Sequence, residues 1–194
     1  MYNILKVEDS VQGYVSLTLL VDSETKQYTV RSSVYLELGS PVRGDALGDV
    51  ELDTLILADE YYRAKRAALS ILSYGDNNKK TLATKLRARS ISEPVAREVV
   101  IEMCSLGYID EGRQLRRLIV EDVNRKLLGP KKVVPRLLAK GYSLSDIKDI
   151  YEELVRSGEI DIEESREKLV SKHLGDKRDG ESVKRLLFKY GYDF

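Results

Sequence analysis

The chain has 194 residues, 42% hydrophobic and 33% charged, with 32 Lys and Arg residues balancing 32 Asp and Glu residues. This composition excludes a disordered chain, and no apolar run reaches the roughly 20 residues that a membrane-spanning helix needs. Residues 1–9 also lack the pattern of a secretion signal, and the single Cys104 cannot form an internal disulfide, so we expect a cytoplasmic protein.

The N-terminal residues predict a β-hairpin. Tyr14–Val21 is apolar and rich in β-branched residues, Asp22–Thr25 follows as a turn, and Gln27–Val30 returns as the second strand. This spacing predicts a loop of four to five residues, and Ile4–Val7 is a candidate third strand.

Two short helices are expected after the hairpin. Val34–Leu38 is followed by Gly39, which suits a helix closed by a glycine in the left-handed conformation. Leu47–Leu57 is a second short helical candidate. We therefore expect residues 1–57 to form an N-terminal region of a hairpin and short helices.

From residue 58 onward the chain repeats itself every 51 residues. Asp59, Asp110 and Asp161 share this spacing, and each precedes an amphipathic stretch whose first N–H groups an aspartate can cap. The apolar positions that follow recur in step, as on one face of a helix. The expected units are two full repeats, residues 58–109 and 110–160, and a partial repeat of two helices, residues 161–194.

Polar residues and glycines mark the ends of the later helices in each repeat. The expected starts of the second helices are Asn78 and Gly129-Pro130, and those of the third helices are Ser92 and Ser143; the expected ends include Gly107, Gly141, Gly158 and Gly191. A three-helix unit cannot bury all its apolar surface alone, so neighbouring units should stack. We expect a mainly α fold in which tandem three-helix repeats form an elongated, curved array after a small β-hairpin region.

The sequence contains no catalytic or metal-binding constellation that we recognise. One histidine and one cysteine exclude zinc sites that need several such ligands, and no phosphate-binding glycine motif is present. His173 is expected on the surface and Cys104 as a small buried residue. We therefore expect no cofactor and no enzymatic activity.

Basic residues are the candidates for partner or DNA binding. Residues 78–143 hold 15 Lys and Arg against 7 Asp and Glu, whereas residues 1–57 hold 4 against 9. Corresponding helices of the two full repeats would present similar basic patches to phosphates or to an acidic protein groove. Tyr108 and Tyr142 are expected to pack rather than to stack on bases. The candidate residues are Lys79, Lys80, Lys85, Arg89, Arg113, Arg117, Lys131, Lys132, Arg136 and Lys140.

Several segments together resemble the RecX regulatory proteins of bacteria. They are residues 67–74, 82–86, 106–110, 128–133 and 137–141, in the family's order and spacing from about residue 58 to 154. The resemblance implies a monomeric modulator that binds RecA and its filament on single-stranded DNA and inhibits recombinase, ATPase and coprotease activities. It implies at most weak contact with single- or double-stranded DNA. After Asp110, the chain keeps the family's Arg113 but lacks its usual aromatic residue, and Thr81 stands where an acidic residue is common.

The alternative hypothesis is a stand-alone DNA-binding protein of helix-turn-helix-like type, because three-helix units with glycine turns have similar sequences. An enzyme is the least favoured class, since no nucleophile occurs with a matching base.

Overall fold

In a computed structural model, the chain is described over residues 1–11, 13–175 and 179–193. It divides into two compact units. The first unit combines residues 1–75 and 83–105, and the second combines residues 76–82 and 106–194. The predicted domain boundary between residues 57 and 58 does not coincide with a boundary between these two units.

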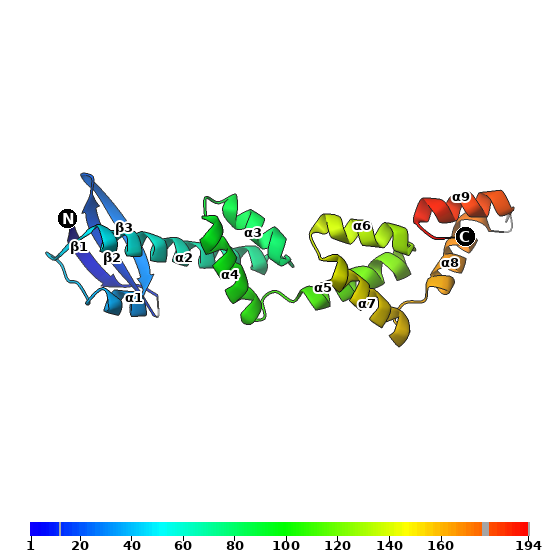
Figure 1. Ribbon diagram of the computed structural model, residues 1–194, viewed down its shortest axis with the longest axis horizontal. Coiled ribbons are helices and arrows are strands. Elements are labelled where there is room, and N and C mark those ends of the chain that lie inside the picture. The colour runs from blue at the N-terminus through cyan, green and yellow to red at the C-terminus, as the bar shows by residue number, and fades with distance from the viewer. Residues whose placement is uncertain (12, 176–178, 194) are drawn as a thin grey trace. The chain divides into compact units, whose positions relative to one another are not determined.

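The first unit begins with an antiparallel sheet of order β3-β2-β1-β4 (Figure 1). Its strands are β1 (Tyr2–Asp9), β2 (Tyr14–Val21), β3 (Glu24–Arg31) and the short β4 (Ala46–Leu47). The candidate strand at Ile4–Val7 is thus confirmed as the centre of β1. Leu17 and Leu19 alternate with less buried neighbours and are fully buried on one face, as the two-residue period of a strand requires.

The β2–β3 loop is shorter than the sequence led us to expect. Val21 pairs with Glu24, so only Asp22 and Ser23 form the loop. Both have positive φ, +52° and +66°, which is the requirement of a type I′ turn. The predicted loop of four to five residues is wrong because Asp and Ser adopt a conformation for which glycine or asparagine is the usual signal.

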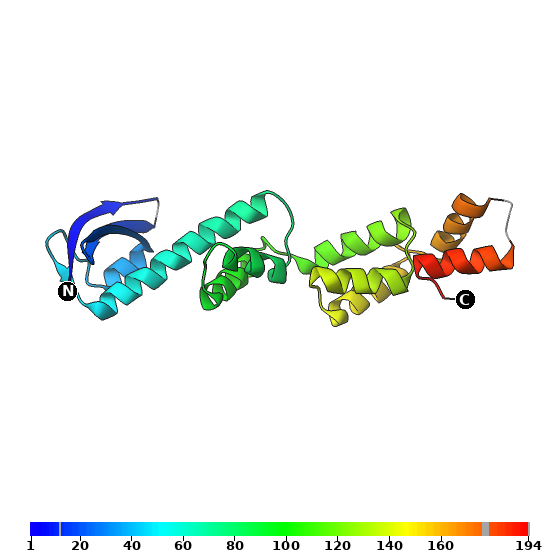
Figure 2. The same cartoon turned by 90° about the horizontal axis from the view of Figure 1, so that it is seen from above.

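One long helix replaces the expected second short helix. After α1 (Ser32–Glu37), helix α2 runs without a break from Asp49 to Ser73, and its first half lies along the sheet (Figure 2). Leu52 and Leu55 are buried in the core of the sheet. The separate helix expected at Leu47–Leu57 is therefore wrong, because packing on the sheet stabilises the first half of one continuous helix.

Asp59 is not a helix cap, since it lies inside α2. Its carboxylate accepts hydrogen bonds from the backbone N–H of Thr29, at 2.9 Å, and from Arg63 Nε, at 2.8 Å. Asp59 precedes the helix caps Asp110 and Asp161 by 51 and 102 residues, but its carboxylate connects α2 to β3 of the sheet instead of capping a helix.

Helices α3 (Lys79–Arg87) and α4 (Glu93–Ser105) follow. The first residues of α3 belong to the second unit and the remainder to the first. In the first unit, Val99 and Met103 of α4 and Ala64 and Ala68 of α2 are fully buried or nearly so. Cys104 is only partly buried, so the prediction that it is a small buried residue is wrong.

The second unit is helical. It contains α5 (Glu111–Val120), continued by one π turn, η1 (Glu121–Arg125), then α6 (Pro130–Lys140), α7 (Leu144–Ser157), α8 (Ile162–Leu174) and α9 (Gly180–Tyr190). Helices α3 and α6 start 51 residues apart, as do α4 and α7, and α5 and α8. Residues 176–178 and 194 of the expected third repeat lie outside the described residues.

The predicted caps of the second unit are confirmed. Asp110, Ser143 and Asp161 each accept a hydrogen bond from the backbone N–H three residues later. Gly141, Gly158 and Gly191 end their helices in the left-handed conformation, Gly107 also has positive φ, and Asn78 caps α3 through Thr81 N–H. Ser92 precedes α4, and its hydroxyl donates to Glu60 at 3.0 Å.

Two apolar clusters form the core of the second unit. One gathers α5, α6 and α7 around residues such as Leu115, Leu137 and Leu154, all fully buried. The other joins Leu169 and Leu187 of α8 and α9 to Leu127. Across the described parts of the chain, no helix is both long and apolar enough to cross a membrane.

Candidate interaction surface

The start of α3 meets the end of α6 at a polar contact that we name the first joint, formed by Asn77, Asn78, Gln114, Lys140, Gly141 and Tyr142. Asn78 Nδ2 donates to the carbonyl oxygen of Lys140 at 2.8 Å, and Asn78 Oδ1 accepts from Thr81 N–H at 2.8 Å. Asn78 is buried, so these bonds satisfy groups that water does not reach.

Gln114 of α5 is buried and forms hydrogen bonds with two other residues of the first joint. Its Nε2 donates to the carbonyl oxygen of Asn77 at 3.2 Å, and the Tyr142 hydroxyl donates to its Oε1 at 2.9 Å. Burial raises the pKa of Tyr142, which keeps its hydroxyl protonated as a donor at neutral pH. Tyr142 therefore packs in the protein, as expected.

A second joint, formed by Leu127, Gly129, Tyr190, Gly191 and Tyr192, repeats this arrangement between α6 and α9. Gly129 N–H donates to the Tyr190 carbonyl oxygen at 2.9 Å, and Lys131 N–H donates to that of Gly191 at 3.1 Å. The Tyr192 hydroxyl donates directly to the Leu127 carbonyl oxygen at 3.2 Å. Burial raises the pKa of Tyr192 to about 12.

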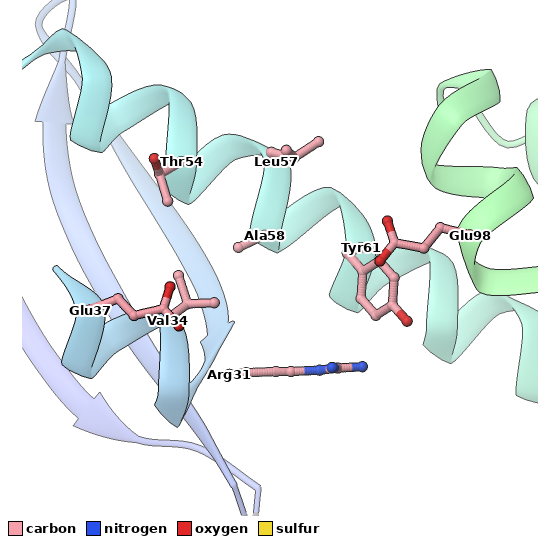
Figure 3. A pocket seen from close by; sticks show the side chains of 8 residues that line it. All are labelled: Arg31, Val34, Glu37, Thr54, Leu57, Ala58, Tyr61 and Glu98. Carbon is pink, nitrogen blue, oxygen red and sulfur yellow. The ribbon is translucent and has the colours of Figure 1, made fainter. Parts of the chain in front are cut away.

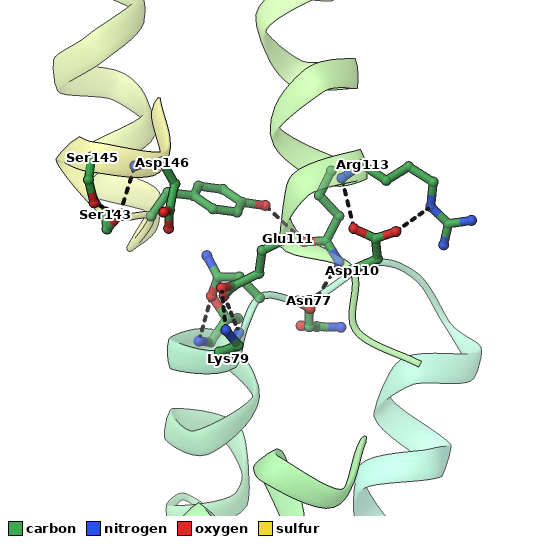
Figure 4. Close-up of polar contacts among 12 residues, drawn as sticks. Asn77, Lys79, Asp110, Glu111, Arg113, Ser143, Ser145 and Asp146 are labelled. Carbon is green, nitrogen blue, oxygen red and sulfur yellow. Dashed lines mark hydrogen bonds and ion pairs between the residues drawn. The ribbon is translucent and has the colours of Figure 1, made fainter. Parts of the chain in front are cut away.

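Four of the candidate basic residues surround the first joint. Lys79 pairs with Glu111, at 3.2 Å, and its backbone N–H also donates to that carboxylate (Figure 4). Arg113 lies 3.9 Å from Asp110 and its side chain is 75% exposed. The other two are Lys80, whose side chain lies against Gly141, and Arg117, which pairs with Asp76 at 2.6 Å.

Lys131 and Lys132 lie beside the second joint, as Lys79 and Lys80 lie beside the first. Lys131 pairs with Asp193, and the stem of Lys132 lies against Gly191. Lys140 ends α6 with an exposed side chain, while its carbonyl oxygen belongs to the first joint. The two joints thus carry lysines at matching positions.

Arg136 has a structural contact that the sequence did not reveal. Its guanidinium pairs with Asp122 of η1, whose side chain is fully buried, and Lys126 pairs with the same carboxylate at 3.0 Å. Only about a third of the Arg136 side chain is exposed, at 35%. Its guanidinium is therefore committed to neutralising a buried charge.

Lys85 and Arg89 belong to the first unit and not to the joints. Both are exposed, and Arg89 Nη1 donates to the carbonyl oxygen of Ala67 at 3.5 Å. Tyr108 is 54% exposed, which contradicts the expectation that it packs.

The first unit contains a polar cluster that no sequence pattern predicted. Glu102 accepts from Arg31 at 3.1 Å, Lys65 at 2.8 Å and the Tyr61 hydroxyl at 2.5 Å. Burial opposes ionisation of Glu102, but the hydrogen bonds from Lys65 and Tyr61 outweigh it and hold its pKa below the usual value. Burial and the bond to Glu102 raise the pKa of Tyr61 to about 12.

No metal-binding group was found in the part of the chain that the structure describes, counting sets of three or more His, Cys, Asp and Glu side chains. His173 is exposed, as expected, and its Nε2 lies 3.2 Å from the Tyr190 hydroxyl. In both joints, buried polar groups hold helices together and lysines lie beside them.

Comparison with known proteins gave two curated relatives of one name. A "Regulatory protein RecX" of Clostridioides difficile (strain 630) is 25% identical over 119 residues, covering 61% of this chain and 56% of that protein. A "Regulatory protein RecX" of Clostridium acetobutylicum is 26% identical over 172 residues, covering 87% of this chain and 77% of the relative. No family model matches the chain.

Solved structures show the same fold. A crystal structure of regulatory protein RecX superposes with a TM-score of 0.74 at 20% identity, covering 100% of this chain and 95% of that one. RecX from Lactobacillus salivarius gives 0.60 at 22% identity, covering 71% and 91%. The curated relatives carry the name of the family that the sequence motifs resemble, and these crystal structures share the fold of the chain, so the predicted resemblance to RecX regulatory proteins is confirmed.

Proposed function

We propose that this chain is a regulator that binds the RecA recombinase and its filament on single-stranded DNA, and inhibits the recombinase, ATPase and coprotease activities. The observation that carries the proposal is that both curated relatives are named regulatory proteins, together with motifs that resemble RecX. The protein acts by occupying and bridging sites on the filament, without covalent chemistry of its own.

The repeat organisation is part of this proposal. Residues 58–109, 110–160 and 161–194 are two full repeats and one partial repeat, and the matching joints support it. Asn78 and Gly129 are 51 residues apart and each donates to the carbonyl oxygen of the residue before the closing glycine. Lysines recur beside both joints, so neighbouring repeats present similar positive groups to regularly spaced sites on a filament.

The test uses one lysine from each joint. In the variant Lys132→Glu/Lys140→Glu, we expect about tenfold weaker inhibition of the DNA-dependent ATPase of RecA from the same organism, because charge reversal opposes an acidic partner surface. Lys148→Glu/Lys172→Glu makes the same change in net charge on α7 and α8, and should inhibit like the wild type.

Arg136 is left out of the variant because it neutralises the buried Asp122. Absence of RecA binding by the wild-type chain at low salt would overturn the proposed function. Tight, strongly salt-dependent binding to DNA alone, with no effect on RecA, would favour the stand-alone DNA-binding protein instead.

A further inference from the structure

The first unit contains a pocket that the proposed function does not use. It has a volume of about 250 Å³ and lies between α1, the middle of α2 and α4, beside the end of β3 (Figure 3). All its lining residues belong to the first unit: Arg31, Val34, Glu37, Thr54, Leu57, Ala58, Tyr61 and Glu98.

One wall of the pocket is apolar and accessible. Val34 of α1 and Leu57 and Ala58 of α2 line it, and Leu57 is 58% exposed. The volume is below the roughly 300–1,000 Å³ of small-molecule sites, and therefore suits one or two side chains of a protein segment. Burial of Leu57 under such a side chain would remove apolar surface from water.

The opposite wall is held in place before any partner arrives. The Arg31 guanidinium lies 4.8 Å from the centre of the Tyr61 ring, and Glu102 fixes both residues through hydrogen bonds. A wall fixed in this way loses little conformational entropy on binding, which favours affinity. The flat faces of Arg31 and Tyr61 suit an aromatic or branched aliphatic side chain.

Acidic groups flank the pocket. Glu37 and Glu98 lie on different helices at its edge and are exposed, and among the described residues neither has an ion-pair partner (Figure 3). Arg31, Lys65 and Glu102 together carry a net charge of +1. With Glu37 and Glu98, these five side chains carry a net charge of −1.

We propose that this pocket receives a bulky apolar side chain from a partner protein segment in which lysines or arginines flank that side chain. The apolar wall takes the central side chain, and Glu37 and Glu98 pair with its basic neighbours. The site belongs to the first unit, so the proposal does not depend on regulation of RecA.

The test measures binding of fluorescein-labelled hexapeptides to the full chain by fluorescence anisotropy at low salt. The probes are Lys-Arg-Phe-Leu-Arg-Lys, its acidic counterpart Glu-Asp-Phe-Leu-Asp-Glu, and Lys-Arg-Ser-Gly-Arg-Lys, which lacks the apolar pair. We expect the first peptide to bind at least about tenfold more tightly than either of the others.

Two variants locate the binding. Glu37→Lys/Glu98→Lys and, separately, Leu57→Ala should each weaken binding of the first peptide about tenfold, and the exposure of Leu57 makes its truncation harmless to the fold. Asp9→Lys/Asp53→Lys makes the same charge change outside the pocket and should bind like the wild type. Circular dichroism verifies that each variant is folded.

Three results would overturn the proposal. The first is equal binding of the basic and acidic apolar peptides. The second is unchanged affinity in folded Glu37→Lys/Glu98→Lys. The third is concentration-dependent dimerisation that Leu57→Ala abolishes, which would assign the pocket to a second copy of the chain.

Discussion

The side chain of Asn78 donates to the backbone carbonyl of Lys140 at 2.8 Å, a contact that the backbone of Gly129 makes to Tyr190 at the second joint, at 2.9 Å. The same hydrogen bond is thus formed by a side chain at one joint and by the main chain at the other. A glycine allows the close approach, because a Cβ atom at residue 129 would lie 2.4 Å from the Gly191 carbonyl oxygen.

Replacement of Asn78 by alanine should destabilise the second unit more than loss of a simple helix cap. Asn78→Ala removes the cap of α3, worth about 1 kcal/mol, and also removes the part-buried hydrogen bond to the Lys140 carbonyl oxygen, worth about 1 kcal/mol more. Urea unfolding followed by circular dichroism measures the change. Ser143→Ala is the control, since it removes a cap and an exposed hydroxyl contact with Ser145 but no contact between helices, and it should cost about 1 kcal/mol. Equal losses in the two variants would contradict the role of the joint.

Gly129→Ala, compared with Gly158→Ala, should distinguish a steric clash of the added methyl group from the strain of a left-handed backbone. Residue 129 has an ordinary φ of −77°, so alanine is destabilising only because its methyl group meets the backbone of Gly191 and Tyr192, and we expect a loss of about 3 kcal/mol. Gly158→Ala is the comparison, since φ is +76° there but the space is open, and it should cost about 1 kcal/mol. Amide hydrogen exchange around residues 190–192 should rise only in Gly129→Ala.

Arg136→Met should show that Arg136 stabilises the second unit. The change removes the guanidinium from the fully buried Asp122 and leaves Lys126 as the cation paired with it, so we expect a loss of about 1.5–3 kcal/mol. The measurement is again urea unfolding. Lys132→Met, on the same helix but without a buried partner carboxylate, should change stability by less than about 0.5 kcal/mol. A nearly neutral Arg136→Met would return Arg136 to the candidates for partner binding.

The Glu102 cluster should give the first unit an acid-sensitive stability. The pKa of Glu102 is lower in the folded chain than its unfolded value of about 4.3, so its contribution is present above that pH and is lost as pH falls below it. Urea midpoints measured between about pH 6 and pH 2 should fall less steeply in Glu102→Gln than in the wild type. Exposed Glu24→Gln should retain the wild-type slope.

Ionisation of Tyr61 should make the stability of the first unit fall at alkaline pH. Burial raises its pKa to about 12, whereas an unfolded tyrosine titrates near pH 10. Its contribution is therefore complete below about pH 10 and is lost as pH rises toward 12. Unfolding midpoints between these values should decline less in Tyr61→Phe than in the wild type. An identical decline in both would show that Tyr61 is not the group responsible.

Local signals in the sequence determined much of the helical half. Capping residues and closing glycines act within a few residues of themselves, so Asp110, Ser143, Asp161 and the glycines at 141, 158 and 191 could be read without tertiary information. The 51-residue spacing placed most helix starts for the same reason. It failed at Asp59, because an aspartate at a capping position and one bound to a neighbouring strand look alike in sequence.

Tertiary structure alone decided which basic residues remain available and where the first unit has its pocket. Arg136 and Lys132 are both basic residues of α6, yet only Arg136 meets a buried carboxylate, from a helix 14 residues away in sequence. Glu102 likewise gathers Arg31, Tyr61 and Lys65 from two other elements. Such pairings depend on distances set by the packing of whole helices and strands, whereas a cap or a closing glycine depends only on its own turn of the chain.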